Sequence, residues 1–155
     1  MLWCLADAAL ENEDFARARE LWERGASLGD PACWVGLGFM FDTGQGVEVD
    51  KEKALRCYRA AWRQRNASAA NNIAGLYRQM GNRRAMFRWL RRAAEHGDDG
   101  ANLDLSRCYL NGVGVRRSLD EAVRCLARVM AGGCVSEAER DEARELLKGL
   151  RPRGL

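Results

Sequence analysis

Histidine, proline and paired cysteines are scarce in this chain, and each scarcity argues against a class of function. Among 155 residues there are one histidine and two prolines. The six cysteines form no Cys-x-x-Cys pair and lie in apolar patterns of helical spacing, which predicts buried thiols and no disulfide framework or zinc site. A serine elbow, a phosphate-binding loop and a His-Glu-x-x-His motif are also missing. We therefore expect no enzyme activity, no cofactor, no metal and no small-molecule substrate.

Long apolar runs and a strong net charge are missing as well. No apolar segment approaches the roughly 20 residues needed to cross a bilayer, and the first residues, MLWCLADAALENEDF, lack the basic stretch of a secretory leader. The formal charge of +3 neither requires nor excludes an anionic partner. We expect a cytoplasmic protein that does not bind membranes and is a monomer or a weak oligomer.

The residues that are abundant favour helices. Alanine, leucine, arginine and glutamate are frequent, and these side chains lose little conformational freedom in a helix. The 47% apolar and 30% charged residues are normal for a globular protein. Composition therefore predicts an all-α fold.

One pattern occurs twice, at Leu37–Ala61 and at Leu105–Val129, 68 residues apart. The two copies match position by position, as in Leu37 and Leu105, Gly44 and Gly112, Gly46 and Gly114, Ala54 and Ala122, and Cys57 and Cys125. A conserved spacing of glycines and apolar residues indicates a repeated supersecondary unit.

The spacing extends beyond these two copies. Ala18, Ala54, Met86 and Ala122 share one register and are separated by 36, 32 and 36 residues. The register predicts one domain, 1–150, of four helix-turn-helix repeats and a capping helix, followed by a disordered tail. Their expected ranges are 1–29, 30–66, 67–98 and 99–134 for the repeats, 136–149 for the capping helix and 151–155 for the tail.

Several turns and helix starts follow from single residues. Gly44 and Gly46 allow the positive φ angles of a compact loop, after which Val47 can pack back on the core. Asp50 is expected to cap the next helix, and Asp30-Pro31 combines a capping acceptor with the residue best suited to the first helical position.

The last two helices carry capping boxes, Ser118 with Glu121 and Ser136 with Glu139. In the final helix Ala138, Leu146 and Leu147 are the main apolar residues, so we expect them to face the preceding repeat. The tryptophans fall mostly in the apolar registers, which predicts that they belong to the core; Trp62 is the one we expect at a repeat junction or the surface.

The repeats resemble Sel-1-like repeats, relatives of the tetratricopeptide repeat. Their pattern is A-x-x-x-L-G-x-x-Y-x-x-G-x-G-V, an acidic cap, and K-A-x-x-W-Y-x-x-A-A. The second repeat matches it at Leu37, Gly38, Phe41, Gly44, Gly46, Val47, Asp50, Lys53, Ala54, Tyr58, Ala60 and Ala61. The fourth matches less fully, since Ser106 replaces the glycine. The resemblance implies an α–α superhelix, or solenoid, that acts as an adaptor or scaffold, often in bacteria.

By similarity to tetratricopeptide arrays, the first helix of each repeat would line a concave wall that binds a peptide or protein. The partner-binding positions are then Val35, Phe39, Asp42, Asn71, Arg78, Gln79, Leu103, Arg107 and Asn111, with Ala32 and Ser68 beside them. Val35 and Phe39 can bury apolar side chains, Asn71 can bond an extended backbone, and the arginines can pair with carboxylates. The alternative is an exposed helix face without a partner.

The run NRRAMFRWLRR places Arg84, Arg88, Arg91 and Arg92 in one stripe, with Arg83 nearby. A solvated face is the interpretation we favour, ahead of an acidic protein partner. Nucleic-acid binding through the Arg83–Arg92 stripe is the remote alternative, because the net charge is small and no aromatic platform accompanies the arginines. An immunity or regulatory protein that neutralises a cognate effector remains the alternative to an adaptor, and the sequence does not choose between them.

Overall fold

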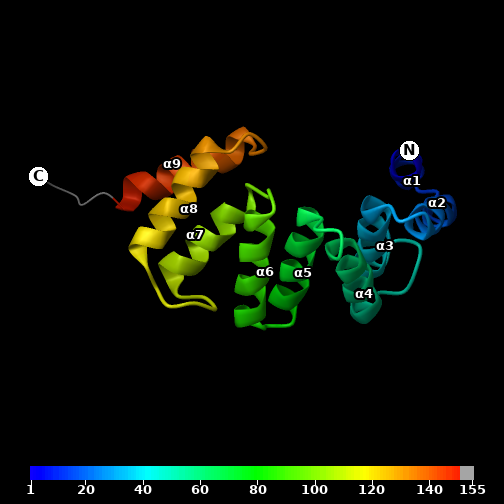
Figure 1. Ribbon diagram of the computed structural model, residues 1–155, viewed down its shortest axis with the longest axis horizontal. Coiled ribbons are helices and arrows are strands. Elements are labelled where there is room, and N and C mark those ends of the chain that lie inside the picture. The colour runs from blue at the N-terminus through cyan, green and yellow to red at the C-terminus, as the bar shows by residue number, and fades with distance from the viewer. Residues whose placement is uncertain (151–155) are drawn as a thin grey trace, which may run out of the picture. The chain divides into compact units, whose positions relative to one another are not determined.

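The computed structural model describes residues 1–150, and the tail predicted for 151–155 lies outside the described residues. Within 1–150 the chain forms nine helices and no strand (Figure 1). The helices are α1 (Leu2–Glu11), α2 (Phe15–Ser27), α3 (Pro31–Thr43), α4 (Lys51–Trp62), α5 (Ala67–Gln79), α6 (Arg83–Glu95), α7 (Ala101–Asn111), α8 (Leu119–Ala131) and α9 (Glu137–Leu150). The all-α prediction is confirmed.

The helices belong to two compact units, Met1–Leu76 and Tyr77–Leu155, whose border lies within α5. In the first unit α1 packs on α2, α2 on α3 and α3 on α4. In the second unit α6 packs on α7, α7 on α8 and α8 on α9, as Figure 1 shows. Consecutive helices joined by a short loop, such as α1 and α2 or α3 and α4, form helix-turn-helix elements.

The predicted caps are present where helices begin. Asp30 accepts a hydrogen bond from the backbone N–H of Ala32 at 2.9 Å, ahead of Pro31 at the start of α3. Asp50 accepts one from the backbone N–H of Lys53 at 2.9 Å, and that bond lowers the pKa of the Asp50 carboxyl. These side chains satisfy helix N–H groups that have no intrahelical partner.

Of the two predicted capping boxes, the one at α9 is complete and the one at α8 is half-formed. The hydroxyl of Ser118 accepts from the N–H of Glu121 at 3.3 Å, but the N–H of Ser118 donates to the carbonyl of Tyr109 at 3.0 Å and not to Glu121. At α9 the bonding is reciprocal, because Glu139 accepts from the backbone N–H of Ser136 at 2.8 Å and donates its own N–H to the Ser136 hydroxyl at 3.3 Å.

The glycine-rich turn of the second repeat has the predicted conformation. Gly44 and Gly46 have φ angles of 78° and 69°, in the left-handed region. The N–H of Gly44 closes α3 by donating to the carbonyl of Met40 at 2.9 Å, and Val47 packs against the core of the first unit. The glycines therefore shape the loop between α3 and α4.

The core of the first unit combines small residues with large rings. Its fully buried members include Ala6, Ala18, Trp22, Cys33 and Met40. Burial raises the pKa of the Cys33 thiol to about 11, so this thiol is protonated and packs as a small apolar group. The expectation of buried thiols holds for four cysteines and is wrong for Cys4 and Cys134, which are exposed.

In the second unit a core cluster forms between α7, α8 and α9. It contains Leu103, Leu126, Val129, Val135 and Ala143, with Leu146 and Leu147 packed against it. The placement of Leu103 on a partner-binding wall is therefore wrong: only 4% of this residue is exposed, because it shares a core with Ala143 of α9. Ala138 is exposed and Ala143 is the buried alanine of α9.

Candidate functional site

The first unit contains a cavity of about 300 Å³ that we call the Phe39 cavity. Val35 and Phe39, both predicted partner-binding residues, line it from α3, and Trp3 lines it from α1. Phe39 is 39% exposed. The prediction that all tryptophans except Trp62 are core residues is wrong for Trp3, which lies at this opening and is exposed. Ala32 and Ser68 also line the cavity.

Two polar groups stand at the wall of the Phe39 cavity. The indole nitrogen of Trp22 is buried and forms no hydrogen bond of ordinary geometry. Burial raises the pKa of the nearby Asp7 carboxyl, the Trp22 N–H lowers it in part, and the charge of Glu11 raises it further. The Trp22 ring lies so close to Gly36 that a Cβ there would be 2.3 Å from the ring. The cavity thus offers apolar surface and an indole N–H that faces the Asp7 carboxyl.

The second unit contains a cavity of about 420 Å³ that we call the Arg107 cavity. Three predicted partner-binding residues, Arg78, Arg107 and Asn111, line it together. Asp104 holds both guanidinium groups, with an N–O distance of 2.5 Å to Arg78 and 2.8 Å to Arg107. Arg107 also pairs with Glu142, and the hydrogen bond to Glu142 raises the pKa of Arg107.

The other predicted partner-binding residues are not gathered in these cavities. Asp42 is half-buried and forms an ion pair with Lys51. Asn71 and Gln79 are exposed but line neither cavity, and Leu103 is buried as described above. Partner binding by Asp42, Asn71 and Gln79 stays a prediction, whereas the prediction for Leu103 is wrong.

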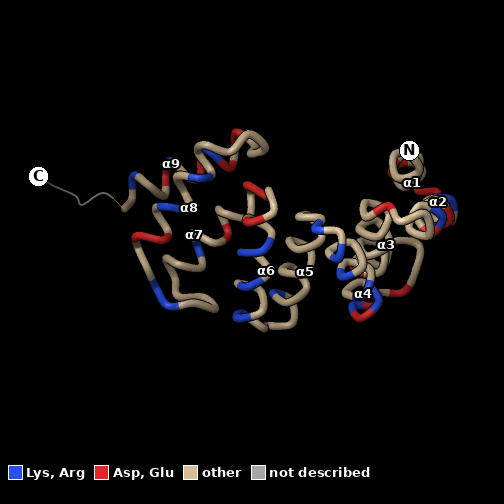
Figure 2. The backbone as a smooth tube through the Cα atoms, in the orientation of Figure 1, with Lys and Arg blue, Asp and Glu red and all other residues tan. Residues whose placement is uncertain are grey.

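The arginines of the predicted stripe are all exposed on α6, and Figure 2 shows basic residues spaced along this helix. Arg91 forms an ion pair with Glu95 at 3.3 Å, and the Arg92 guanidinium lies 4.5 Å from the centre of the Trp89 ring. Arg84 and Arg88 have no side-chain partner within residues 1–150. Two of the four arginines are therefore already engaged, which fits a solvated face.

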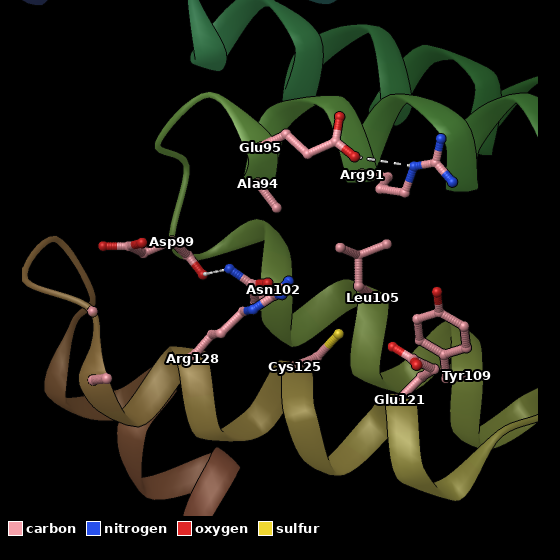
Figure 3. A pocket seen from close by; sticks show the side chains of 12 residues that line it. Arg91, Ala94, Glu95, Asp99, Asn102, Leu105, Tyr109, Glu121, Cys125 and Arg128 are labelled. Atoms are coloured by element: carbon pink, nitrogen blue, oxygen red, sulfur yellow. Dashed lines mark hydrogen bonds and ion pairs between the residues drawn. The ribbon is translucent and has the colours of Figure 1, made fainter.

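A third hollow, which the sequence analysis missed, lies between α6, α7 and α8 and is shown in Figure 3. We call this space of about 630 Å³ the Asn102 groove. Asn102, Leu105 and Tyr109 face it from α7 at helical spacing. Cys125 and Arg128 face it from α8.

The walls of the Asn102 groove are held firmly. The Tyr109 ring contacts Phe87 edge to face, with 5.3 Å between ring centres and 85° between planes. Asn102 donates through its side-chain nitrogen to the carbonyl of Asp99 at 3.2 Å, as Figure 3 shows. Burial raises the pKa of the Cys125 thiol, so this thiol is neutral at pH 7.

The sequence does contain a signal that could have indicated this groove, namely a difference between the second and the fourth repeat. Shifting by 68 residues places Trp34 at the position of Asn102 and Ala60 at that of Arg128. The second repeat is thus apolar where the fourth has an amide and a guanidinium. Apolar residues at these positions are compatible with the repeat, so the polar pair is not required by the packing.

Other site types have little support in the described part of the chain. Within residues 1–150 no three His, Cys, Asp or Glu side chains are grouped so that they could hold a metal ion. In the same range no helix combines the length and the apolar character that spanning a membrane requires.

The sequence matches the model of the Sel1 repeat over residues 9–30, 35–66, 87–98 and 100–128, which is more than half of the chain. It is 31% identical over 105 residues to the uncharacterized protein NMB1327 of Neisseria meningitidis serogroup B (strain ATCC BAA-335 / MC58). The aligned part is 68% of this chain and 22% of that protein, so the chain spans about a fifth of this relative.

Two solved structures are similar to this one at 24% sequence identity. The Sel1 repeat protein from Oxalobacter formigenes has a TM-score of 0.74, and the match covers 87% of this chain and 57% of that one. The protein c5321, a protective antigen of uropathogenic Escherichia coli strains with a Sel1-like repeat fold, has a TM-score of 0.78 over 96% of this chain and 33% of that one. These likenesses show the predicted α–α solenoid fold.

Proteins of this kind are in general protein-interaction modules. The matched residues include both glycine-rich turns and both copies of the pattern that recurs after 68 residues. The chain belongs to the Sel1 repeat family.

Proposed function

We propose that this chain is an adaptor that binds a peptide segment of a protein partner through the Phe39 cavity and the Arg107 cavity. The observation that carries the proposal is that residues selected from the sequence as partner-binding positions line these two cavities, one in each unit. We treat each cavity as a separate contact site.

The Phe39 cavity suits an apolar side chain. Phe39, Val35 and Trp3 offer partly exposed apolar surface, and burying such surface yields about 25 cal/mol per Å². Exposed aromatic side chains at a cavity are typical anchors for protein partners.

The Arg107 cavity suits an acidic side chain. Arg107 is paired with both Asp104 and Glu142, whereas within residues 1–150 the carboxylate partner of Arg78 is Asp104, which it shares with Arg107. A carboxylate from the partner protein would give Arg78 an ionic partner of its own. The half-exposed positions of both arginines leave their remaining N–H groups within reach of a ligand.

The test is selection of binders from a phage library of random peptides on the full chain, followed by fluorescence anisotropy with the selected peptides. Phe39→Ala should weaken binding about tenfold or more, as expected for an aromatic anchor. Val123→Ala is the matched control, since Val123 is equally exposed at 39% and lines no cavity described above.

The second cavity has its own pair of variants. Arg78→Ala should weaken acidic peptides about tenfold, whereas Arg84→Ala, which removes an exposed arginine from α6, should leave their affinity unchanged. Peptides that bind the wild type, Phe39→Ala and Arg78→Ala equally well would refute the proposal.

A further inference from the structure

We propose that the Asn102 groove is an additional binding site, distinct from the two cavities above, for a peptide segment that carries a carboxylate. On α7 the residues Asn102, Leu105 and Tyr109 lie on one side, while Asp104 and Arg107 lie on the opposite side, because a helix advances about 100° per residue. The groove and the Arg107 cavity therefore use opposite faces of one helix.

The side-chain oxygen of Asn102 is the first observation that points to a ligand. Asn102 is 3% exposed, and its Oδ1 has no hydrogen-bond donor. A buried acceptor without a partner destabilises a fold. The second repeat has Trp34 at the equivalent position, so packing does not demand an amide here. A donor supplied by a ligand would remove this cost.

Glu95, Asp99 and Glu121 are the carboxylates that line the groove, and Asp99 accepts a hydrogen bond from the backbone N–H of Cys134 at 3.5 Å. Glu95 is paired with Arg91, and Glu121 is paired with Arg124 at 2.5 Å. Arg128 is exposed and forms no ion pair within residues 1–150. Its guanidinium is therefore the free partner for a carboxylate at this groove.

The two unmet groups together specify the ligand chemistry. Asn102 Oδ1 needs a donor and Arg128 needs an anion, and a peptide offers a backbone N–H close to a carboxylate. A phosphodiester offers acceptors alone and would leave Oδ1 unsatisfied, so the phosphate backbone of a nucleic acid fits this pair of groups less well.

The volume of the Asn102 groove and the access to it are compatible with a short peptide segment. The groove of about 630 Å³ lies within the range of about 300–1,000 Å³ usual for ligand sites. Leu105, Ala94 and the neutral Cys125 thiol give it an apolar floor. In Figure 3 the Arg128 side chain extends from α8 towards Asn102. Because Arg128 is exposed, a change of its rotamer opens the way to Oδ1 when its guanidinium takes the carboxylate.

The experiment is a titration of the full chain, labelled with ¹⁵N, with three peptides observed by NMR. The probes are N-acetyl-trialanine with a free carboxylate, its C-terminal amide, and N-acetyl-Ala-Asp-Ala amide. We expect the side-chain signals of Asn102 and Arg128 to shift with a carboxylate probe and not with the trialanine amide. The tighter of the two acidic probes identifies whether the carboxylate comes from a chain end or a side chain.

Two variants separate binding from structure. Arg128→Ala should raise the Kd about tenfold or more, while Arg84→Ala, which removes an exposed arginine of α6 outside the groove, should not change it. Asn102→Leu should weaken binding about fivefold or more and leave the Tm unchanged or higher, because it removes the unsatisfied oxygen.

Three results would overturn the proposal. The first is the absence of shifts at Asn102 and Arg128 with either acidic probe, and the second is an equal response to the amide. The third is an Asn102→Leu variant that is less stable yet binds as the wild type does, since that would make Asn102 a structural residue.

Discussion

Replacing Gly38 with alanine should destabilise the protein although alanine is the better helix former. A Cβ at Gly38 would lie 2.5 Å from Cε1 and 2.6 Å from Cδ1 of Tyr58. Tyr58 is 1% exposed, so its ring cannot move into solvent. Alanine gains about 1 kcal/mol of helix propensity, whereas overpacking costs about 1–3 kcal/mol. A contact this short should cost about 3 kcal/mol, the upper end of the range for overpacking, so the net loss of unfolding free energy is about 2 kcal/mol.

Gly75 supplies the matched control for this variant. It lies within α5, and a Cβ there would meet nothing within 4 Å. Gly75→Ala should therefore stabilise the protein by about 1 kcal/mol through helix propensity alone. Urea unfolding followed by circular dichroism measures both changes. The reasoning is refuted if the two substitutions shift stability in the same direction.

The fourth repeat tolerates a side chain at the position of Gly38, and this suggests a second measurement. Ser106 is the equivalent residue and is fully buried, and Leu126 stands where the second repeat has Tyr58. In a Tyr58→Leu background, Gly38→Ala should then stabilise by about 1 kcal/mol through helix propensity, which gives a coupling energy of about 3 kcal/mol in the double-mutant cycle. An equal cost in both backgrounds would show that the ring is not the cause.

Two further predictions concern the C-terminal part. Leu103→Ala should cost about 2–5 kcal/mol of unfolding free energy because Leu103 is buried in the core with Ala143; Leu119→Ala, at an exposed position, is the control, and equal small effects in urea would contradict the core assignment. The bonds from Ser136 lower the pKa of Glu139, so its contribution is present above its unfolded pKa near 4.5 and is lost as the pH falls through the folded value. The difference in unfolding free energy between the wild type and Glu139→Gln should vanish in acid. A difference that stays constant with pH would show that the ionised Glu139 carboxylate does not stabilise the cap.

Local signals in the sequence were sufficient for most of the fold. Asp30, Asp50 and Ser136 cap helices as predicted, because a capping bond spans two or three residues and depends on little else. Gly44 and Gly46 take positive φ angles for an equally local reason. Such features can be predicted because the residues that decide them are neighbours in sequence.

The errors concern residues whose surroundings come from other helices. Leu103 fits the first-helix pattern of an exposed wall, yet it shares a core with Ala143 of α9, some 40 residues later. Ala138 and Ala143 are both apolar positions of the final helix, and only contact with the preceding repeat makes Ala143 the buried one. Helical periodicity identifies a face, but the partner of that face is a tertiary property.

The comparison of the repeats separates packing from function more sharply than either repeat alone. Leu37 and Leu105 are both buried and identical, as are Cys57 and Cys125, because the helix-turn-helix interface needs the same shapes in both copies. At the position of Asn102 the copies differ in polarity, and the polar copy has an unsatisfied buried oxygen. A repeat can keep such a group only if the rest of the fold compensates for it. The difference therefore identifies Asn102 as a position where the residue that favours ligand binding is expected to lower the stability of the fold.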